Sequence, residues 1–404
     1  MPEPAPATPQ LEWLYSRRRV SARRSPANAR RLLAEAGGPD GAVPAVRVAG
    51  TNGKGATAVI VARALTQAGV RTGCFVSPHL ESFGERISVD GVELTAAETE
   101  GLIARVRELP GAGEAGFFDL TLAMAALHFA RNDVEAVVLE AGVGAANDAT
   151  AAWRGRVAAS AVTSVDYDHV ATIGPTIHRI AEEKAQAGEE PGWLVTGAQG
   201  EGLEALAEVC RARGLECLNG PDLTLPAEFS LRGSGNRRSA AVAVALLRAQ
   251  ERWRVDEAAI AAALRTVSWP GRGEHAWIAG RRVIYDIAHN SSALDLLLAD
   301  LTSEPGSSGA RFIFGAMRTK NWYRMLRRLP AERTYAATAS SGVAVPARDL
   351  ARAHPGVRPC SGAPDALLYA LEETPPGGLV VVTGSAYVVG EARSWARSGA
   401  VWAA

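Results

Sequence analysis

Cysteine is scarce in this sequence of 404 residues, and long apolar runs are missing from it. The four cysteines, at positions 74, 210, 217 and 360, form no CxxC pair and no metal-binding spacing, which predicts reduced thiols and a cytoplasmic location. No apolar run approaches the roughly 18 residues of a membrane span, and we expect no signal peptide. The 43 basic and 43 acidic residues balance, which excludes a general affinity for nucleic acid or an anionic membrane.

Lysine is rarer still. Only Lys54, Lys184 and Lys320 occur among the 43 basic residues. Arginine serves wherever a surface needs only positive charge, so each remaining lysine is a candidate for a role that requires a compact, titratable ammonium group. The first two lie in motif-like segments, which favours a functional role for both. For Lys320, chance survival is an equal alternative.

The order of elements predicts an α/β protein of two domains. A Pro-rich tip and an Arg-rich helical segment form a lead-in that ends at residues 37–39. From Ala45 onward short apolar strands alternate with helices, which predicts a mainly parallel, doubly wound sheet. The turn-rich segment 269–273 separates this domain, residues 1–270, from a smaller one, residues 271–404. In the smaller domain the alternation restarts, which predicts a Rossmann-like α/β unit.

The clearest chemical signal lies between the first strand and the first helix of this alternation. There the chain reads Gly50, Thr51, Asn52, Gly53, Lys54, Gly55, Ala56, Thr57. The glycines allow backbone N–H groups to converge on phosphate oxygens, the helix N-terminus adds positive potential, and the lysine adds a charge for the β and γ phosphates. Val48 and Gly55 depart from the strict Walker A pattern, and a structural turn is the alternative. We therefore predict a P-loop-type, ATP-binding first domain.

Eight further motifs follow the loop in order along the chain. They are SPHLESFGERI (77–87), LEAGVGAANDAT (139–150), TSVDYDHVATIG (163–174), IAEEKA (180–185), WPGR (269–272), DIAHN (286–290), FGAMRTKN (314–321) and VVTGSAYVVGEAR (381–393). Together with GTNGKGAT, this series resembles the folylpolyglutamate synthase and dihydrofolate synthase family of the Mur ligase superfamily. The resemblance spans nearly the whole chain.

That resemblance implies an ATP-dependent amide ligase. Members of the family phosphorylate the carboxylate of dihydropteroate or a folate, and the amino group of L-glutamate then attacks the acyl phosphate. Such chemistry needs a divalent metal, because a polyanionic nucleotide must approach another anion. The resemblance therefore implies ATP and Mg²⁺, with small molecules as the only partners and with neither nucleic acid nor membrane. A monomer, a second metal ion and a potassium ion are further expectations from it.

The resemblance also assigns metal ligands. Ser77, Glu140 and His169 match the magnesium ligands of the family, each near the carboxyl end of a predicted strand. Lys184 matches a lysine that is carbamylated in the family and then binds a second metal ion, a reaction that needs an uncharged amine. The residues alone leave alternatives open: a turn for the serine, a helix start paired with Asp168 for the histidine, and a solvated charged face for the lysine.

The second domain completes the expected site. By resemblance, Arg272 and Asp286 contact ATP, and His289 lies near the γ-phosphate and the incoming glutamate. Closure of this domain over the nucleotide would keep water from the acyl phosphate. The resemblance thus makes Lys54, Lys184 and His289 the catalytic residues. The alternative for segment 286–290 is a strand end with polar turn residues.

Some positions depart from the family pattern. Ala56 replaces the usual serine of the loop, and 145–147 (Ala-Ala-Asn) replaces Gly-Arg-Leu ahead of Asp148. Segment 233–239 stands where members carry a His-Gln pair and then an asparagine that helps hold adenine. These departures keep two other hypotheses open, an amide ligase for a different carboxylate and a nucleotide-binding homologue that has lost catalysis.

Overall fold

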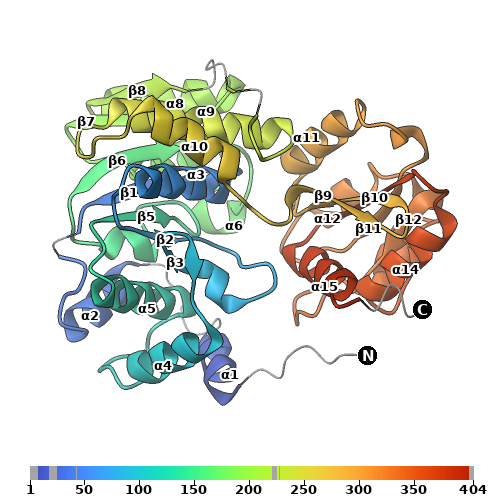
Figure 1. Ribbon diagram of the computed structural model, residues 1–404, viewed down its shortest axis with the longest axis horizontal. Helices are drawn as coiled ribbons and strands as arrows, with labels where there is room; N and C mark the ends of the chain where they lie inside the picture. The colour runs from blue at the N-terminus through green and yellow to red at the C-terminus, as the bar shows by residue number, and fades with distance from the viewer. Residues whose placement is uncertain (1–7, 18–24, 42, 221–224, 227, 400–404) are drawn as a thin grey trace. The chain divides into compact units, whose positions relative to one another are not determined.

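The computed structural model describes residues 8–17, 25–41, 43–220, 225–226 and 228–399. By its internal contacts the chain divides into two units (Figure 1). Unit 1 comprises Met1–Ser77, Phe83–Phe229 and Arg238–Val267, and unit 2 comprises Pro78–Ser82, Ser230–Arg237 and Ser268–Ala404. We expected two continuous segments, 1–270 and 271–404. In the structure, two short segments that precede the expected boundary pack with unit 2 instead.

Unit 1 is built on an eight-stranded sheet with the order β4-β3-β2-β5-β1-β6-β7-β8. Its strands are β1 (Ala45–Ala49), β2 (Thr72–Phe75), β3 (Ile87–Val89), β4 (Val92–Glu93), β5 (Ala136–Glu140), β6 (Val157–Val162), β7 (Gly192–Thr196) and β8 (Leu215–Asn219). The strands from β2 to β8 in this order pair in parallel, whereas β3 and β4 pair antiparallel at one edge. The expected doubly wound, mainly parallel sheet is confirmed.

The helices of unit 1 cover both faces of this sheet (Figure 1). They are α1 (Pro9–Ser16), α2 (Ala27–Glu35), α3 (Lys54–Gln67), α4 (Ala96–Arg107), α5 (Phe117–Arg131), α6 (Val170–Ile173), α7 (Ile177–Ala185), α8 (Gly200–Ala212), α9 (Ser234–Ala249) and α10 (Glu257–Thr266), with short 3-10 turns at Phe83–Arg86 and Ala149–Ala152. Because helices lie on both sides, every residue of β5 is buried. The first four residues of α9 belong to unit 2 by their contacts.

The N-terminal lead-in contributes to the core of unit 1. Leu14 of α1 and Leu32 and Leu33 of α2 are almost completely buried in one cluster with Phe129 and Trp153. Burial of a leucine side chain contributes about 2 kcal/mol. The lead-in is therefore an integral layer of unit 1.

Unit 2 has a six-stranded sheet with the order β13-β12-β11-β14-β10-β9. Its strands are β9 (Arg272–Ile278), β10 (Arg281–Asp286), β11 (Arg311–Phe314), β12 (Thr334–Ala336), β13 (Arg358–Pro359) and β14 (Leu379–Thr383). All pair in parallel except β9, which pairs antiparallel with β10. The start of β9 lies within segment 269–273, which we expected to be a turn. The sequence signal for the strand is weak there because Gly273, a residue that disfavours strands, is its second residue.

The helices of unit 2 are α11 (Ser291–Leu301), α12 (Trp322–Leu326), α13 (Ala347–Ala353), α14 (Ala363–Glu373) and α15 (Ala386–Arg397), with short 3-10 turns at Ser307–Gly309 and Ala331–Arg333. Successive residues of β10 point to opposite faces of the sheet. Val283 and Tyr285 accordingly lie in one hydrophobic cluster, and Ile284 lies in another. Unit 2 is thus a sheet with an apolar layer on each face, as the Rossmann-like prediction requires.

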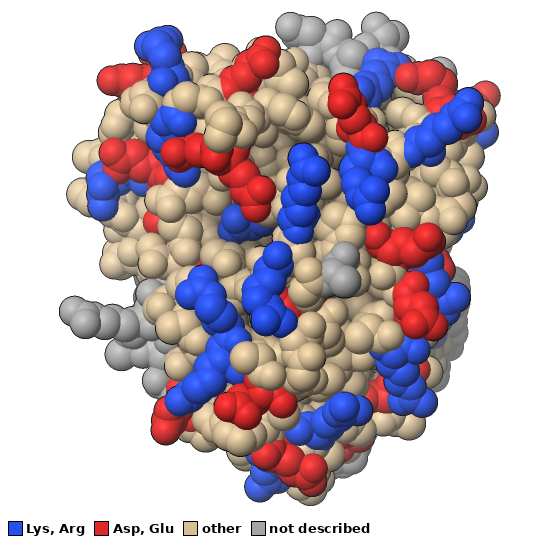
Figure 2. Space-filling model, turned by 90° about the vertical axis from the view of Figure 1, so that its left-hand side faces the viewer, with Lys and Arg blue, Asp and Glu red and all other residues tan. Residues whose placement is uncertain are grey.

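The surface and the helices are consistent with the charge and hydropathy of the sequence. On the face drawn in Figure 2, acidic and basic side chains are interspersed and no large field of one sign forms. Within the described ranges, no helix has the length and apolar character that crossing a membrane requires.

Candidate active site

The loop after β1 lies where the sequence predicts it. β1 ends at Ala49 and α3 begins at Lys54, so the second half of the motif forms the first turn of the helix. Gly50 and Gly53 adopt positive φ values of 146° and 85°, a backbone conformation that favours glycine. The first N–H groups of α3 have no acceptor within the helix, and the helix dipole makes this end positive. The loop can therefore receive an anion such as a phosphate group.

The side chain of Lys54 lies at the same helix end. Its Nζ donates a hydrogen bond to the carbonyl of Thr51 at 3.2 Å. Val48, which occupies the position of the first Walker A glycine, is a buried strand residue that pairs with both β5 and β6. The departure from the Walker pattern thus lies in the strand and leaves the turn itself unchanged.

Two residues that the sequence analysis did not single out hold this loop in shape. The Thr163 hydroxyl donates to the carbonyl of Asn52 at 2.7 Å, and the Ser164 hydroxyl accepts the Asn52 N–H at 2.8 Å. Both residues follow β6, which lies next to β1 in the sheet. Their motif was visible in the sequence, but their supporting role follows only from the order of the strands.

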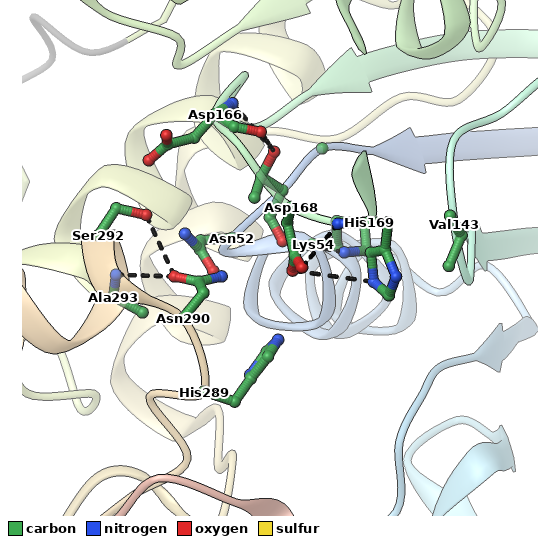
Figure 3. Close-up of polar contacts among 12 residues, drawn as sticks. Asn52, Lys54, Val143, Asp166, Asp168, His169, His289, Asn290, Ser292 and Ala293 are labelled. Carbon is green, nitrogen blue, oxygen red and sulfur yellow. Dashed lines mark hydrogen bonds and ion pairs between the residues drawn. The ribbon is translucent and has the colours of Figure 1, made fainter. Parts of the chain in front are cut away.

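Thr51 connects the loop to the segment that carries His169. The Thr51 hydroxyl donates to the Asp166 carbonyl and accepts the Asp166 N–H, both at 3.1 Å (Figure 3). His169 precedes α6 with a φ of 52°, and its Nε2 lies 3.8 Å from Oδ2 of Asp168. The His169 side chain is 40% exposed. This geometry matches the alternative of a helix start paired with Asp168, and a metal-binding role for His169 stays a prediction.

Glu140 and Ser77 come together at the carboxyl ends of neighbouring strands. Glu140 ends β5 and is 3% exposed, and its Oε2 accepts the backbone N–H of Ser77 at 2.7 Å. A carboxylate this buried requires a compensating donor or cation. Carboxylate and hydroxyl oxygens suit a hard divalent ion. In the part of the chain that the structure describes, no three His, Cys, Asp or Glu side chains gather around an ion site, so the expected ligand set stays a prediction.

Lys184 lies inside the protein, and a solvated helix face is therefore the wrong alternative for it. The residue is on α7 and is 3% exposed. Its Nζ donates to the carbonyl of Gly50 at 2.7 Å. Lys184 thus reaches the same loop that carries Lys54, although the two lysines are 130 positions apart in the sequence. Carbamylation of Lys184 stays a prediction.

The positions that depart from the family pattern have local partners in unit 1. Asn147 donates from its backbone N–H and its side-chain amide to the carboxylate of Glu183, at 3.1 and 3.3 Å. Ala56 is 4% exposed in the first turn of α3. Ser239 is also buried, and its carbonyl accepts the Thr57 hydroxyl at 3.2 Å. Segment 233–239 therefore contributes a residue that packs directly against the loop and α3.

In unit 2, Arg272 and Asp286 face each other across β9 and β10. Asp286 accepts the N–H groups of Gly273 and Ala288 at 2.9 and 2.8 Å. Burial raises the pKa of the Asp286 carboxyl group to about 6, although these two hydrogen bonds and the positive charge of Arg272 oppose the shift. The Arg272 guanidinium lies 4.8 Å from the centre of the Trp269 ring. The pair lies at the carboxyl end of β10, where an α/β sheet places a site.

His289 and Asn290 connect β10 to α11. Nδ1 of His289 lies 3.1 Å from the carbonyl of Ile287, and the side chain is half-buried. Asn290 is the N-cap of α11, and its Oδ1 accepts the Ala293 N–H at 2.9 Å and the Ser292 hydroxyl at 3.1 Å (Figure 3). The DIAHN motif is thus a strand end that also forms a helix cap, and a role for His289 near phosphate stays a prediction. Ser385 similarly caps α15, after Gly384.

Comparison with known proteins gives a consistent result. No family model matches the chain. A curated protein of Haloferax volcanii, described as a probable bifunctional folylpolyglutamate synthase/dihydropteroate synthase, is 32% identical over 436 residues, which cover 96% of this chain and 50% of that protein. The chain spans about half the length of the two haloarchaeal relatives that it matches.

A second relative matches over almost its full length. The dihydrofolate synthase/folylpolyglutamate synthase of Bacillus subtilis is 27% identical over 420 residues, which cover 94% of this chain and 97% of that protein. Among solved structures, the folylpolyglutamate synthase of Mycobacterium tuberculosis in complex with ADP and AMPPCP has a TM-score of 0.82 and 25% identity, and the match covers 95% of this chain and 98% of that one. The likeness therefore includes both units.

Proposed function

We propose that this chain, which belongs to the folylpolyglutamate synthase/dihydrofolate synthase family, is an ATP-dependent ligase that joins L-glutamate to the carboxylate of dihydropteroate or a folate. One observation carries the proposal. The loop Gly50–Gly53 follows β1, and Glu140 is the last residue of the neighbouring strand β5. Both therefore lie at the carboxyl ends of parallel strands in the unit 1 sheet. A site for phosphate oxygens thus lies beside a candidate ligand for the cation that accompanies them.

The loop residues have separate roles in this proposal. The N–H groups that open α3 bind the β and γ phosphates, and Lys54 stabilises the charge that develops during phosphoryl transfer to the acid. Thr163 and Ser164 hold the loop in the conformation that makes these donors converge. The geometry therefore positions charge before the nucleotide arrives, which is the main contribution that a protein makes to phosphoryl transfer.

Glu140 and Ser77 are the proposed holders of Mg²⁺, with His169 as a further ligand. The oxygens of Glu140 and Ser77 fit the ion, and the burial of the Glu140 carboxylate at the end of β5 favours this role. When bound, Mg²⁺ shields phosphate charge so that the carboxylate of the acid can approach. Lys184, as a carbamate, is the proposed ligand of a second ion. In unit 2, Arg272 and Asp286 are proposed nucleotide contacts and His289 a residue near the γ-phosphate.

We further propose that the enzyme is a cytoplasmic monomer that acts only on small molecules. The four cysteines are free thiols in the structure, which fits a reducing compartment. Sedimentation of the purified chain tests the monomer, because a mass of twice 42.3 kDa would contradict it.

The test of the function is a three-substrate assay on the purified chain. We expect ADP and phosphate to be released only when ATP, glutamate and dihydropteroate or tetrahydrofolate are all present. Lys54→Ala should lower the rate about a hundredfold or more, because it removes a fixed charge beside the transferred phosphate. Arg63→Ala is the matched control, since it removes a positive charge from the other end of α3. ADP release that no pterin acid stimulates, or equal rates for the two variants, would overturn the proposal.

Carbamylation of Lys184 has its own test. Mass spectrometry in bicarbonate should detect CO₂ on the peptide that contains Lys184, and Lys184→Arg should remove both this adduct and most activity. Arginine keeps the charge but cannot form the carbamate. Full activity of Lys184→Arg would contradict the role.

A further inference from the structure

Arg393, at the end of the motif 381–393, joins two acidic side chains that are far apart in the sequence. It lies on α15 (Figure 1), and its side chain is 12% exposed. Its Nε donates to the carboxylate of Glu274, on β9, at 2.8 Å. One of its terminal nitrogens pairs with the carboxylate of Glu81. Each of these carboxylates belongs to a segment that adjoins a residue of the proposed site.

The Glu274 contact leads to Arg272. Besides pairing with Arg393, Glu274 accepts the backbone N–H of Gly271 through Oε2 at 2.8 Å. Gly271 directly precedes Arg272 and has a φ of 70°, and its carbonyl accepts the N–H of Ile287 at 2.9 Å. Glu274 therefore fixes the turn that carries Arg272, and Arg393 holds Glu274 in place.

The Glu81 contact leads to Ser77. Glu81 belongs to segment 78–82, which packs with unit 2 and begins directly after Ser77. Leu80 of this segment is 8% exposed and lies in a core cluster of unit 2. Its backbone approaches α15 so closely that a Cβ on Gly390 would lie 2.1 Å from the Leu80 carbonyl oxygen. The segment after Ser77 is thus held against α15 by an ion pair and by close packing.

We propose that Arg393 is a positioning residue for the binding of nucleotide and metal. Through Glu274 it fixes the place of Arg272. Through Glu81 it fixes the place of Ser77. The inference rests on the proposed function, in which these two residues contact ATP and Mg²⁺. Arginine suits the task because its planar group presents several N–H donors in a fixed arrangement and can hold two carboxylates at once.

Hydrogen exchange of the ligand-free, full-length protein tests the geometry, and mass spectrometry measures it. The N–H groups of Ser77 and Gly271 each donate to a carboxylate, so their exchange rates report the two contacts separately. We expect Arg393→Ala to speed exchange at both N–H groups by about tenfold or more, because local opening becomes easier. Glu81→Ala should speed exchange at Ser77 and leave Gly271 unchanged.

Arg154→Ala is the matched control for a general loss of stability. It also breaks an arginine–carboxylate pair, with the buried Asp40, but it lies ahead of β6, at the opposite end of that strand from Thr163. We expect no selective effect of this variant on the two N–H groups. If Arg393→Ala speeds their exchange no more than Arg154→Ala does, the proposal is wrong.

A second pair of variants changes no charge. Gly390→Ala places a Cβ at the Leu80 carbonyl, so the segment must move away from α15 and exchange at Ser77 should rise. Gly101→Ala is the control, since Gly101 also lies within a helix, α4, but has nothing within 4 Å of a Cβ. Equal exchange at Ser77 in these two variants would contradict a role of the segment in placing Ser77.

Calorimetric titration with a non-hydrolysable ATP analogue and Mg²⁺ tests the consequence for binding. We expect Arg393→Ala to weaken binding by about tenfold or more, since residues that orient ligand-binding groups have effects of this size. Arg154→Ala should bind as the unchanged protein does, because a loss of stability alone does not alter the affinity of folded molecules. Unchanged affinity in Arg393→Ala would overturn this inference and leave the proposed function standing. Failure of the unchanged protein to bind the analogue would overturn both.

Discussion

Gly53→Ala tests how tightly the loop is built against α9. Gly53 has a φ of 85°, and a Cβ at this position would lie 2.6 Å from the Ser239 hydroxyl oxygen. Gly69, just beyond the other end of α3, has nearly the same φ of 82° but nothing within 4 Å of a Cβ. The two glycines therefore impose the same backbone strain on an alanine and differ only in their surroundings.

The expected magnitudes follow from this comparison. A left-handed alanine costs about 1 kcal/mol relative to glycine. At position 53 the buried Ser239 hydroxyl must also leave its place, which costs about 1 kcal/mol more. We expect Gly53→Ala to lower the free energy of unfolding by about 2 kcal/mol and Gly69→Ala by about 1 kcal/mol, as measured by urea unfolding of the full chain.

A third variant isolates the contact. Ser239→Ala removes the hydroxyl that the new Cβ would meet, so Gly53→Ala should cost only about 1 kcal/mol in that background. The reasoning is refuted if Gly53→Ala and Gly69→Ala cost the same, or if the extra cost at position 53 persists without the Ser239 hydroxyl.

Three other predictions concern charged groups. Glu140→Ala should abolish the dependence of activity on divalent metal in a metal titration, whereas Glu135→Ala, an exposed residue just ahead of β5, should not. Arg393→Ala should lower the free energy of unfolding by about 2 kcal/mol, because the Arg393 side chain is 12% exposed and pairs with both Glu81 and Glu274. Arg397→Ala is the control: this side chain is 65% exposed, so its removal should cost less than about 0.5 kcal/mol in the same urea experiment. The Asp286 carboxyl group has a pKa of about 6, against about 3.9 in the unfolded chain, so it binds its proton more tightly in the folded state. The free energy of unfolding should therefore fall by up to about 2 kcal/mol as the pH rises from about 4 through 6, and Asp286→Asn should flatten this slope.

The central strands and the loop could be predicted from the sequence because their signals are local. A run of apolar residues such as β5 must be buried, and glycines around a lysine between a strand and a helix have few structural explanations. The short hairpin of β3 and β4 was missed, because strands of three and two residues show no readable alternation. That segment 78–82 packs with unit 2 has no local sequence signal, since this depends on contacts with residues about 200 to 300 positions away, such as Arg393.

The candidate site shows the same division between local and distant signals. The scarcity of lysine made Lys54 and Lys184 visible in the sequence, but nothing local indicated that both ammonium groups would reach one turn, at the Thr51 and Gly50 carbonyls. An arginine at position 184 would bring a larger, planar group with five N–H donors into a site that is 3% exposed, and each buried donor would need an acceptor. Burial beside the loop therefore explains why a chain that otherwise uses arginine keeps lysine at this position, whether or not the amine is carbamylated.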